Sequence, residues 1–382
     1  MIYLDNSATT YPKPFSVCES LKTSPYLYGA NPGRGGYSMS TSTAKEIYKV
    51  RNLLAEMFNA DSEESVIFTL NCTYALNFAI KGLAKNGGHA VTSCLEHNSV
   101  MRPLNKLSES MDFAYDIAEV FPDDEKTVQS FESKLRNNTD FIVCTYASNV
   151  FGDILPIEKI GNMAKKYGIP LIVDAAQAAG ILDIDIKRDN ISCLCMPGHK
   201  GLYGPSGTGV MILSDSCVPD TDIEGGTGSE SRDFTQPAFL PDRFESGTQN
   251  VHGIIALGKG IEFLKKEKIS NIRDHENELI YNFYRYSLNS DFLYIYNNFD
   301  CTKFVPLFSF NCIDFSSEEV AVFLSEKNIA VRGGYHCNIM AHKFYRTDAT
   351  GTVRVSVSAF NSKKDIIYLM NCLNKIAKIK KV

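Results

Sequence analysis

A lysine in a glycine-rich loop and an aspartate at the end of an apolar run are the residues of this 382-residue chain best suited to covalent chemistry. Lys200 stands in the segment 198–209 (GHKGLYGPSGTG), and Asp174 precedes it by 26 residues at the end of PLIVD. Taken singly, Asp174 is explained as a helix cap and Lys200 as a solvated turn residue. Together they suit a pyridoxal phosphate (PLP) site. In such a site a lysine forms a Schiff base with the cofactor, and an acidic residue pairs with the ring nitrogen.

A phosphate site is expected where the apolar run 66–70 (VIFTL) gives way to a helical segment. Asn71, Cys72 and Thr73 occupy this turn. The free backbone N–H groups and the dipole of a helix N-terminus attract an anion, and Thr73 adds a hydroxyl. Asn71 or Thr73 also serves as an ordinary N-cap, and the two interpretations are compatible.

The elements that must position these residues alternate along the first two thirds of the chain. Apolar runs separated by helical patterns predict a mainly parallel sheet with helices on both faces, which is an α/β fold with ligands at the carboxyl ends of its strands. A helix is expected over 41–58, with Thr43 and Glu46 as a capping box. The predicted strands cover residues 66–70, 89–93, 141–145, 170–174, 192–196 and 209–213.

The pattern changes after about residue 265. Segments 307–312, 316–328, 329–332, 352–358 and 362–376 predict β-α-β-β-α, a smaller α+β unit. The first dozen residues have the composition of an irregular arm. We therefore expect an N-terminal arm over 1–14, a large domain over 15–260 and a small C-terminal domain over 261–382.

The composition excludes several classes of protein. With 44% hydrophobic and 22% charged residues, the chain is typical of a folded globular protein. Its formal net charge of −5 argues against nucleic-acid binding by a broad basic face. No apolar stretch approaches the length of a membrane span, and the first residues do not form a secretion signal.

The 11 cysteines are too thinly spread for a disulfide scaffold. Most stand in apolar segments, where a thiol behaves as a small hydrophobic group, so a reducing cytoplasm fits best. Cys193 and Cys195 form a C-x-C pair, but no second pair of ligands is near, and a buried strand is the preferred interpretation. We expect no metal site.

Seven motifs, in order along nearly the whole chain, resemble the class V aminotransferase-fold enzymes, and specifically the cysteine desulfurases and selenocysteine lyases. The family has fold type I of the PLP enzymes and works as a homodimer. The motifs are LDNSATT (4–10), CLEHNS (94–99), SNVFG (148–152), VDAAQAAG (173–180), the lysine loop (198–209), FESGTQN (244–250) and RGGYHC (332–337).

The resemblance implies a cofactor role for nine residues. Lys200 forms the Schiff base, Asp174 keeps the ring nitrogen protonated, and His97 stacks on the ring. The others follow from the same comparison: Gln177 near the ring hydroxyl oxygen, Thr73 and His199 at the phosphate, Cys72 as a further cofactor-binding residue, Asn149 beside cofactor and substrate, and Thr248 at the phosphate of the partner subunit's cofactor.

On the substrate side, the resemblance implies that Arg354 receives the carboxylate, with Asn149 and Arg332 nearby. Cys337 would take the substrate sulfur as a persulfide, for which it must attack as a thiolate. By residue type alone, Cys337 is a structural thiol; the RGGYHC context favours the catalytic role. The implied activity converts L-cysteine to L-alanine, with a sulfur-acceptor protein as a further partner.

Two departures from the family pattern bear on specificity. The segment 332–337 carries Gly333, Gly334 and Tyr335 where better-known desulfurases read nearer to R-T-G-H-H-C, and NPGRGGYS (31–38) keeps Arg34 but lacks a preceding histidine. Selenocysteine lyase, transaminase, β-lyase or epimerase activity therefore stays open. So does a non-catalytic PLP-fold scaffold, against which the retention of Lys200 and Asp174 argues.

Overall fold

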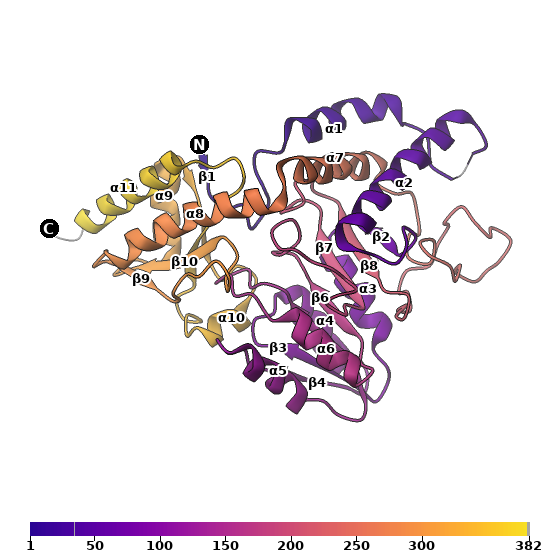
Figure 1. The fold of residues 1–382 in the computed structure, drawn as a ribbon, viewed down its shortest axis with the longest axis horizontal. Coiled ribbons are helices and arrows are strands. Elements are labelled where there is room, and N and C mark those ends of the chain that lie inside the picture. Colours follow the sequence, from indigo (N-terminus) through magenta and orange to yellow (C-terminus); the bar gives the residue numbers. More distant parts are fainter. Residues whose placement is uncertain (34, 380–382) are drawn as a thin grey trace.

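The computed structural model describes residues 1–33 and 35–379, which form a larger part around a seven-stranded sheet and a smaller part at the side (Figure 1). Arg34, which the sequence singles out, lies outside the described residues. The strand order is β2-β8-β7-β6-β5-β3-β4. These strands are β2 (Val66–Thr69), β3 (Gly88–Ser93), β4 (Phe113–Ala118), β5 (Thr139–Thr145), β6 (Leu171–Asp174), β7 (Cys193–Pro197) and β8 (Gly209–Leu213).

The large sheet is mainly parallel, as expected. Strands β3 to β7 pair in parallel, whereas β8 pairs antiparallel with both β7 and β2 at one end of the sheet. Six of the seven strands were predicted, but β4 was missed: Asp116 interrupts its apolar residues, and the four residues at its centre are only partly buried. The carboxyl ends of the parallel strands meet at one edge, where the site is expected.

Helices cover both faces of this sheet because successive strand residues point to opposite sides. In β5, Ile142 and Cys144 join one hydrophobic cluster, whereas Phe141 and Val143 join another. The first cluster includes residues of α2 (Ser38–Phe58), α6 (Ile157–Lys166) and α7 (Val251–Glu267), and the second includes residues of α3 (Cys72–Leu83) and α4 (Asn98–Ser110). The other helices of the larger part are α1 (Phe15–Leu27) and α5 (Asp124–Ser133).

The same alternation explains the C-x-C pair. Cys193 and Cys195 lie on one face of β7, fully buried in the cluster that contains α3. In the chain over 1–33 and 35–379, no group of three or more His, Cys, Asp or Glu side chains is arranged to hold a metal ion.

The capping box predicted at Thr43 and Glu46 is wrong. Helix α2 begins at Ser38, so Thr43 lies inside it and donates its hydroxyl to the Met39 carbonyl at 3.0 Å. A capping box does occur at Ser316 and Glu319, where α9 (Ser317–Glu326) begins. The i, i+3 spacing of the motif also fits a helix interior, so the pattern alone does not fix where a helix starts.

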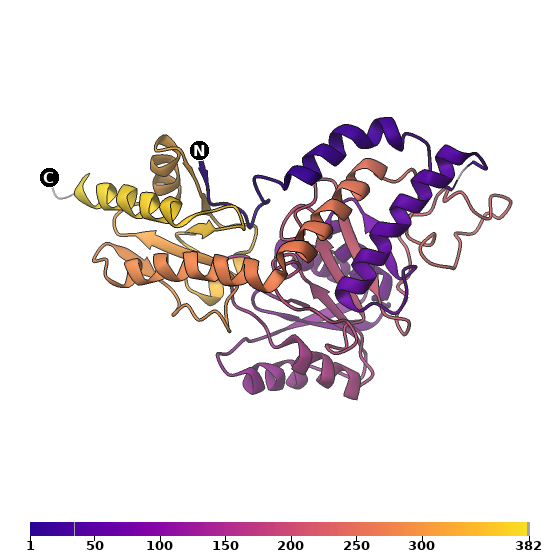
Figure 2. The ribbon, with the colours of Figure 1, turned by 45° about the horizontal axis from the view of Figure 1, so that its top comes forward.

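The smaller part is an antiparallel sheet backed by helices, in the order β12-β13-β10-β9. Its core is a separate hydrophobic cluster that includes Phe283, Phe310 and Leu369. Helix α8 (Ile269–Leu288) follows α7 directly and runs from the larger part into the smaller one (Figures 1 and 2). The other elements are β9 (Leu293–Ile295), β10 (Leu307–Cys312), β11 (Ile329–Ala330), β12 (Arg332–Gly334), α10 (Ile339–Phe344), β13 (Thr352–Ser356) and α11 (Lys363–Ile379).

Two segments near the expected domain limits pack across those limits. Strand β1 (Ile2–Tyr3) pairs in parallel with β11, and Leu4 is buried in the core of the smaller part. Helix α7 spans the expected limit at residue 260, and its Ile261 and Leu264 belong to the large-sheet cluster. The first residues therefore pack with the C-terminal part.

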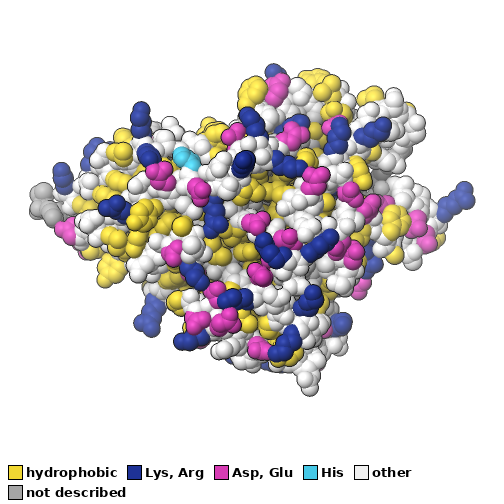
Figure 3. Space-filling view, viewed as in Figure 1, with side chains coloured by type: hydrophobic (Ala, Val, Ile, Leu, Met, Phe, Trp, Pro, Cys, Tyr) yellow, Lys and Arg dark blue, Asp and Glu magenta, His cyan; other side chains and the backbone are white. Residues whose placement is uncertain are grey.

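Acidic and basic side chains are interspersed over the face shown in Figure 3. Among the helices that the structure describes, none is long and apolar enough to cross a membrane.

Candidate active site

A cavity of about 500 Å³ opens at the carboxyl ends of the parallel strands. It is lined by eight of the nine residues that the family resemblance links to a cofactor; the ninth, Thr248, is elsewhere. The eight are Cys72, Thr73, His97, Asn149, Asp174, Gln177, His199 and Lys200.

Lys200 follows β7 and lies on the cavity wall, in a loop that hydrogen bonds to its backbone carbonyl hold in place. Its carbonyl accepts hydrogen bonds from the Tyr203 N–H at 2.8 Å and the Thr10 hydroxyl at 3.1 Å. Removal from water lowers the pKa of the Lys200 ammonium, and the nearby Asp174 carboxylate opposes this shift. A lysine with a lowered pKa gives up its proton more readily, which suits it to Schiff-base formation and to proton transfer.

Asp174 ends β6 and is 3% exposed. Its Oδ1 accepts the Ala176 N–H at 2.9 Å, and the Cys72 thiol lies 3.5 Å from the same oxygen. Burial raises the pKa of Asp174, whereas the Ala176 N–H and the Lys200 charge lower it. A carboxylate held this way favours a cationic partner in the cavity, such as a protonated ring nitrogen.

Two helix N-termini face the cavity. Asn71 caps α3 by accepting the Tyr74 N–H at 3.2 Å, and His97 caps α4 by accepting the Ser99 N–H through Nδ1 at 3.0 Å. The hydroxyls of Thr73 and Ser99 lie 2.9 Å apart between the two helices. Two converging helix dipoles with two hydroxyls form a good site for a phosphate.

The two histidines of the cavity are held neutral. Burial, aided by the Lys200 charge, lowers the pKa of both His97 and His199 to about 4. A neutral His97 ring is suited to stacking on an aromatic cofactor. The Nδ1 of His199 is buried without a hydrogen-bond partner among the described residues, so it is available to a bound group.

Asn149 connects the cavity wall to the loop that carries Cys337. Its Nδ2 donates to the His336 carbonyl and its Oδ1 accepts from the Asn338 amide, both at 2.8 Å. The Cys337 carbonyl also accepts the Asn98 N–H at 2.9 Å, next to His97. The loop is therefore fixed at the start of α4.

Cys337 is exposed and is not among the residues that line the cavity. It follows β12, and both His336 and Cys337 adopt positive φ angles of 52° and 59°. Such angles are uncommon outside glycine, and here the bonds around Asn149 hold the turn. The Arg332 guanidinium lies 3.6 Å from the Cys337 sulfur, so a basic side chain stands next to this thiol.

Arg354 is buried on β13, with 1% of its surface exposed. Its Nη1 donates to the Asn149 carbonyl and its Nη2 to Asp5, both at 2.8 Å. Arg332 lies directly opposite Arg354 in the antiparallel β12–β13 pair. Like charges facing each other across a sheet are unfavourable, so this pair is better explained by an anionic ligand than by stability.

Thr248 does not reach the cavity within one chain. It is exposed and accepts a hydrogen bond from the Asn31 amide at 3.4 Å.

A family model, "Aminotransferase class-V", matches residues 2–369. The chain belongs to this family. Relatives named "Probable cysteine desulfurase" from Methanothermobacter thermautotrophicus and Pyrococcus abyssi are each 31% identical to it, over 98% and 99% of this chain and 94% of theirs.

Solved structures agree with the architecture of this chain. The apo cysteine desulfurase from Thermococcus onnurineus matches with a TM-score of 0.90 at 29% identity, over 99% of this chain and 94% of that one. The cysteine desulfurase CsdA from Escherichia coli matches with a TM-score of 0.86 over the same shares. At 22% identity the latter supports the fold alone.

The cavity of this class-V enzyme fits PLP. Asp174, the neutral His97 and the unpartnered His199 nitrogen provide contacts for a ring and its phosphate. Sequence reasoning missed Ser99 and Tyr74, which also line the cavity. Ser99 stands inside the CLEHNS motif, but only the packing of α4 beside α3 brings its hydroxyl to Thr73.

Proposed function

We propose that this protein is a PLP-dependent cysteine desulfurase that converts L-cysteine to L-alanine and takes the sulfur on Cys337. The observation that carries the proposal is the fixed loop of Cys337, which Asn149 and Asn98 tie to the wall of the cavity containing Lys200 and Asp174. Relatives at about 30% identity carry the name of this activity.

The cofactor would be held by the residues of the cavity wall. Lys200 would bind it covalently, Asp174 would face its ring nitrogen, and Thr73, Ser99 and His199 would surround its phosphate. When bound, PLP supplies an electron sink that makes the α-proton of an amino acid acidic.

The amine of Lys200 would then remove the α-proton, since its lowered pKa makes the neutral base accessible. Arg354 and Arg332 would hold the substrate carboxylate, because two cations on neighbouring strands match one carboxylate.

Cys337 would attack the substrate sulfur as a thiolate. An S–S bond forms, the Cβ–S bond breaks, and its electron pair stays on the substrate carbon, which a proton converts to the methyl group of alanine. The enzyme is left as a Cys337 persulfide. A thiol reductant or an acceptor protein restores the thiol by taking the outer sulfur.

We further propose a homodimer in which Thr248 completes the phosphate site of the partner subunit. Its exposed position outside its own cavity is compatible with that role. All 11 cysteines are free thiols, eight of them buried, which supports residence in the reducing cytoplasm.

The test is release of sulfide and alanine, measured over L-cysteine, L-selenocysteine and other amino acids, with and without a thiol reductant. Stoichiometric alanine and sulfide from L-cysteine, with turnover only when reductant is present, is the expected result. Keto-acid formation, or activity confined to sulfur-free amino acids, would contradict the proposal and favour a transaminase. Activity confined to L-selenocysteine would favour a selenocysteine lyase.

A further inference from the structure

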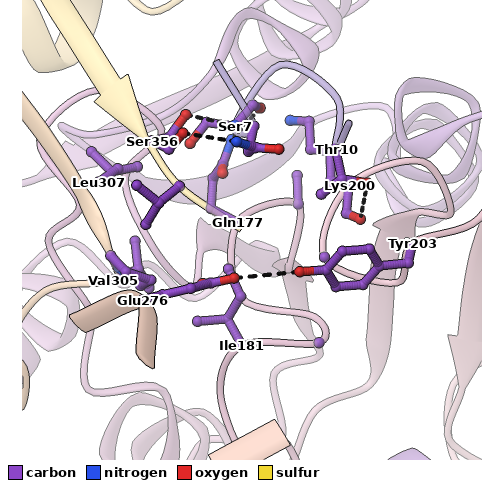
Figure 4. A pocket seen from close by; sticks show the side chains of 16 residues that line it. Ser7, Thr10, Gln177, Ile181, Lys200, Tyr203, Glu276, Val305, Leu307 and Ser356 are labelled. Atoms are coloured by element: carbon purple, nitrogen blue, oxygen red, sulfur yellow. Dashed lines mark hydrogen bonds between the residues drawn. The ribbon is translucent and has the colours of Figure 1, made fainter. Parts of the chain in front are cut away.

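The N-terminal segment 4–13, called here the N-terminal strap, joins the two halves of the site. It runs beside β13, where Leu4 accepts the Ser356 N–H at 2.8 Å. It then crosses to the lysine loop, where the Thr10 N–H donates to the His199 carbonyl at 3.1 Å. Figure 4 shows Ser7 beside Ser356 and Gln177, with Thr10 close to Lys200. The strap therefore sits between the strand of Arg354 and the loop of Lys200.

Asp5 is the acidic residue that the strap places against Arg354. Its Oδ1 accepts the Arg354 Nη2 at 2.8 Å, and its side chain is 19% exposed. The register is set by a bridge between Asp5 and Ser356, two residues along β13 from Arg354. The opposite side of the guanidinium is fixed by the Asn149 carbonyl.

Arg354 keeps capacity for another ligand despite these two bonds. A guanidinium has five N–H donors, and its Nε is buried without a partner among the described residues. The remaining N–H donors would allow a substrate carboxylate to bind while Asp5 stays in place. The local charges are then two arginines, Arg332 and Arg354, and two carboxylates, those of Asp5 and of the substrate.

We propose that Asp5 is a positioning residue that stays paired with Arg354 and weakens the site's affinity for amino-acid carboxylates. The proposal rests on the function proposed above, because it takes the α-carboxylate as the ligand of Arg354. Asp5 orients the guanidinium while its negative charge opposes a second carboxylate, so the alanine product leaves readily.

The test compares L-alanine with L-alaninamide, which lacks the carboxylate charge. Binding to the PLP-loaded enzyme is followed both by the cofactor absorbance and by the rise in Tm. Asp5→Asn keeps an oxygen acceptor for Arg354 but removes the charge. Asp5→Asn should lower the Kd of L-alanine about tenfold and leave the Kd of L-alaninamide unchanged. A tenfold change in Kd corresponds to a modest share of the repulsion energy between two carboxylates a few ångströms apart.

Two controls separate charge from structure. Asp5→Glu keeps the charge and should bind L-alanine like the wild type, and Ser7→Ala alters the strap without changing any charge. Equal effects of Asp5→Asn on both ligands, or weaker binding of L-alanine, would overturn the proposal while leaving desulfurase activity intact. A wild-type enzyme that binds neither ligand would overturn the proposed substrate class as well.

A measurement on the wild type keeps the proposal testable if Asp5→Asn does not fold. The N–H groups of Asn6 and Ser7 bond to Ser356 at 3.3 and 2.8 Å. Their hydrogen exchange should stay slow when L-alanine saturates the enzyme, because Asp5 remains in place. Faster exchange would mean that the carboxylate displaces Asp5, which contradicts the proposal.

Discussion

The Nη2 of Arg332 lies 3.6 Å from the Sγ of Cys337, so a permanent positive charge stands beside the exposed thiol. Between them the chain leaves β12 after Gly334 and turns at His336 and Cys337, both of which have positive φ angles. This contact gives a thiol on the protein surface the electropositive neighbour that a nucleophilic cysteine needs.

Arg332→Gln should slow the reaction of Cys337 with iodoacetamide severalfold, because the substitution removes the basic side chain that contacts the sulfur. Peptide mapping over time at neutral pH gives the rate for this one cysteine. Lys343→Gln, on the neighbouring helix α10, is the matched control and should leave the rate unchanged. An unchanged rate in Arg332→Gln would mean that the contact does not activate the thiol.

Cys337→Ala should bind PLP normally and lose sulfide release from L-cysteine. Because Cys337 is exposed, its removal leaves no core cavity, and Tm should change by less than a few degrees. In the wild type, mass spectrometry after one turnover without reductant should place one added sulfur, about 32 Da, on the Cys337 peptide. Wild-type activity in Cys337→Ala, or an adduct on another cysteine, would contradict the sulfur-acceptor role.

Lys200→Ala should lose both the cofactor absorbance and turnover, because its amine is the proposed attachment point. Borohydride reduction followed by peptide mapping should label Lys200 alone. Lys13 is the matched control: its Nζ lies 2.7 Å from the His199 carbonyl, and burial lowers its pKa to about 8. Lys13→Ala should keep the label, and a label on Lys13 in the wild type would refute the assignment.

The buried carboxyl of Glu276 should make the free energy of unfolding depend on pH. It lines a small cavity of about 30 Å³ behind Lys200 and lies 3.4 Å from the Tyr203 hydroxyl (Figure 4). Burial raises the pKa of its carboxyl to about 8. In the unfolded chain the pKa is about 4.3, so between these values unfolding releases a proton, and the stability from the neutral carboxyl is lost as pH rises toward 8.

Glu276→Gln removes this titration. Its free energy of unfolding, relative to the wild type, should therefore rise from pH 5 to pH 8, by on the order of 2 kcal/mol. Denaturant unfolding at both pH values measures the change. Glu278→Gln, on the same helix but with a half-exposed side chain, is the matched control. A constant difference for Glu276→Gln would mean that the carboxyl is already ionised in the folded protein.

The proposed dimer predicts twice the chain mass of 42.5 kDa in sedimentation equilibrium. Thr248→Ala should weaken PLP binding without dissociating the dimer. A hybrid of Lys200→Ala and Thr248→Ala subunits should regain one intact site of two if Thr248 acts on the partner's cofactor. If the hybrid has no intact site, Thr248 acts in the site of its own subunit. A fully active monomer would contradict the proposed dimer.

Much of the sheet could be predicted because its central strands are buried on both faces and appear as short apolar runs. Strand β4 has half-buried residues and gave no such run. The site residues Asp174 and Lys200 could be chosen because Asp174 ends one strand and Lys200 follows another, and both strand ends are visible in the sequence. Ser99 could not, since its approach to Thr73 depends on how α4 packs beside α3.

The sequence by itself determined the types of the main elements, the order of the motifs and the residue types available for chemistry, because these depend on local periodicity and composition. Tertiary structure alone decided which distant residues meet. Asp5 bonds to Arg354 across 349 residues, and Cys72 lies against Asp174 across 102. Such contacts depend on strand order, on the crossovers between strands and on the packing of the two parts, none of which leaves a periodic signal in the chain.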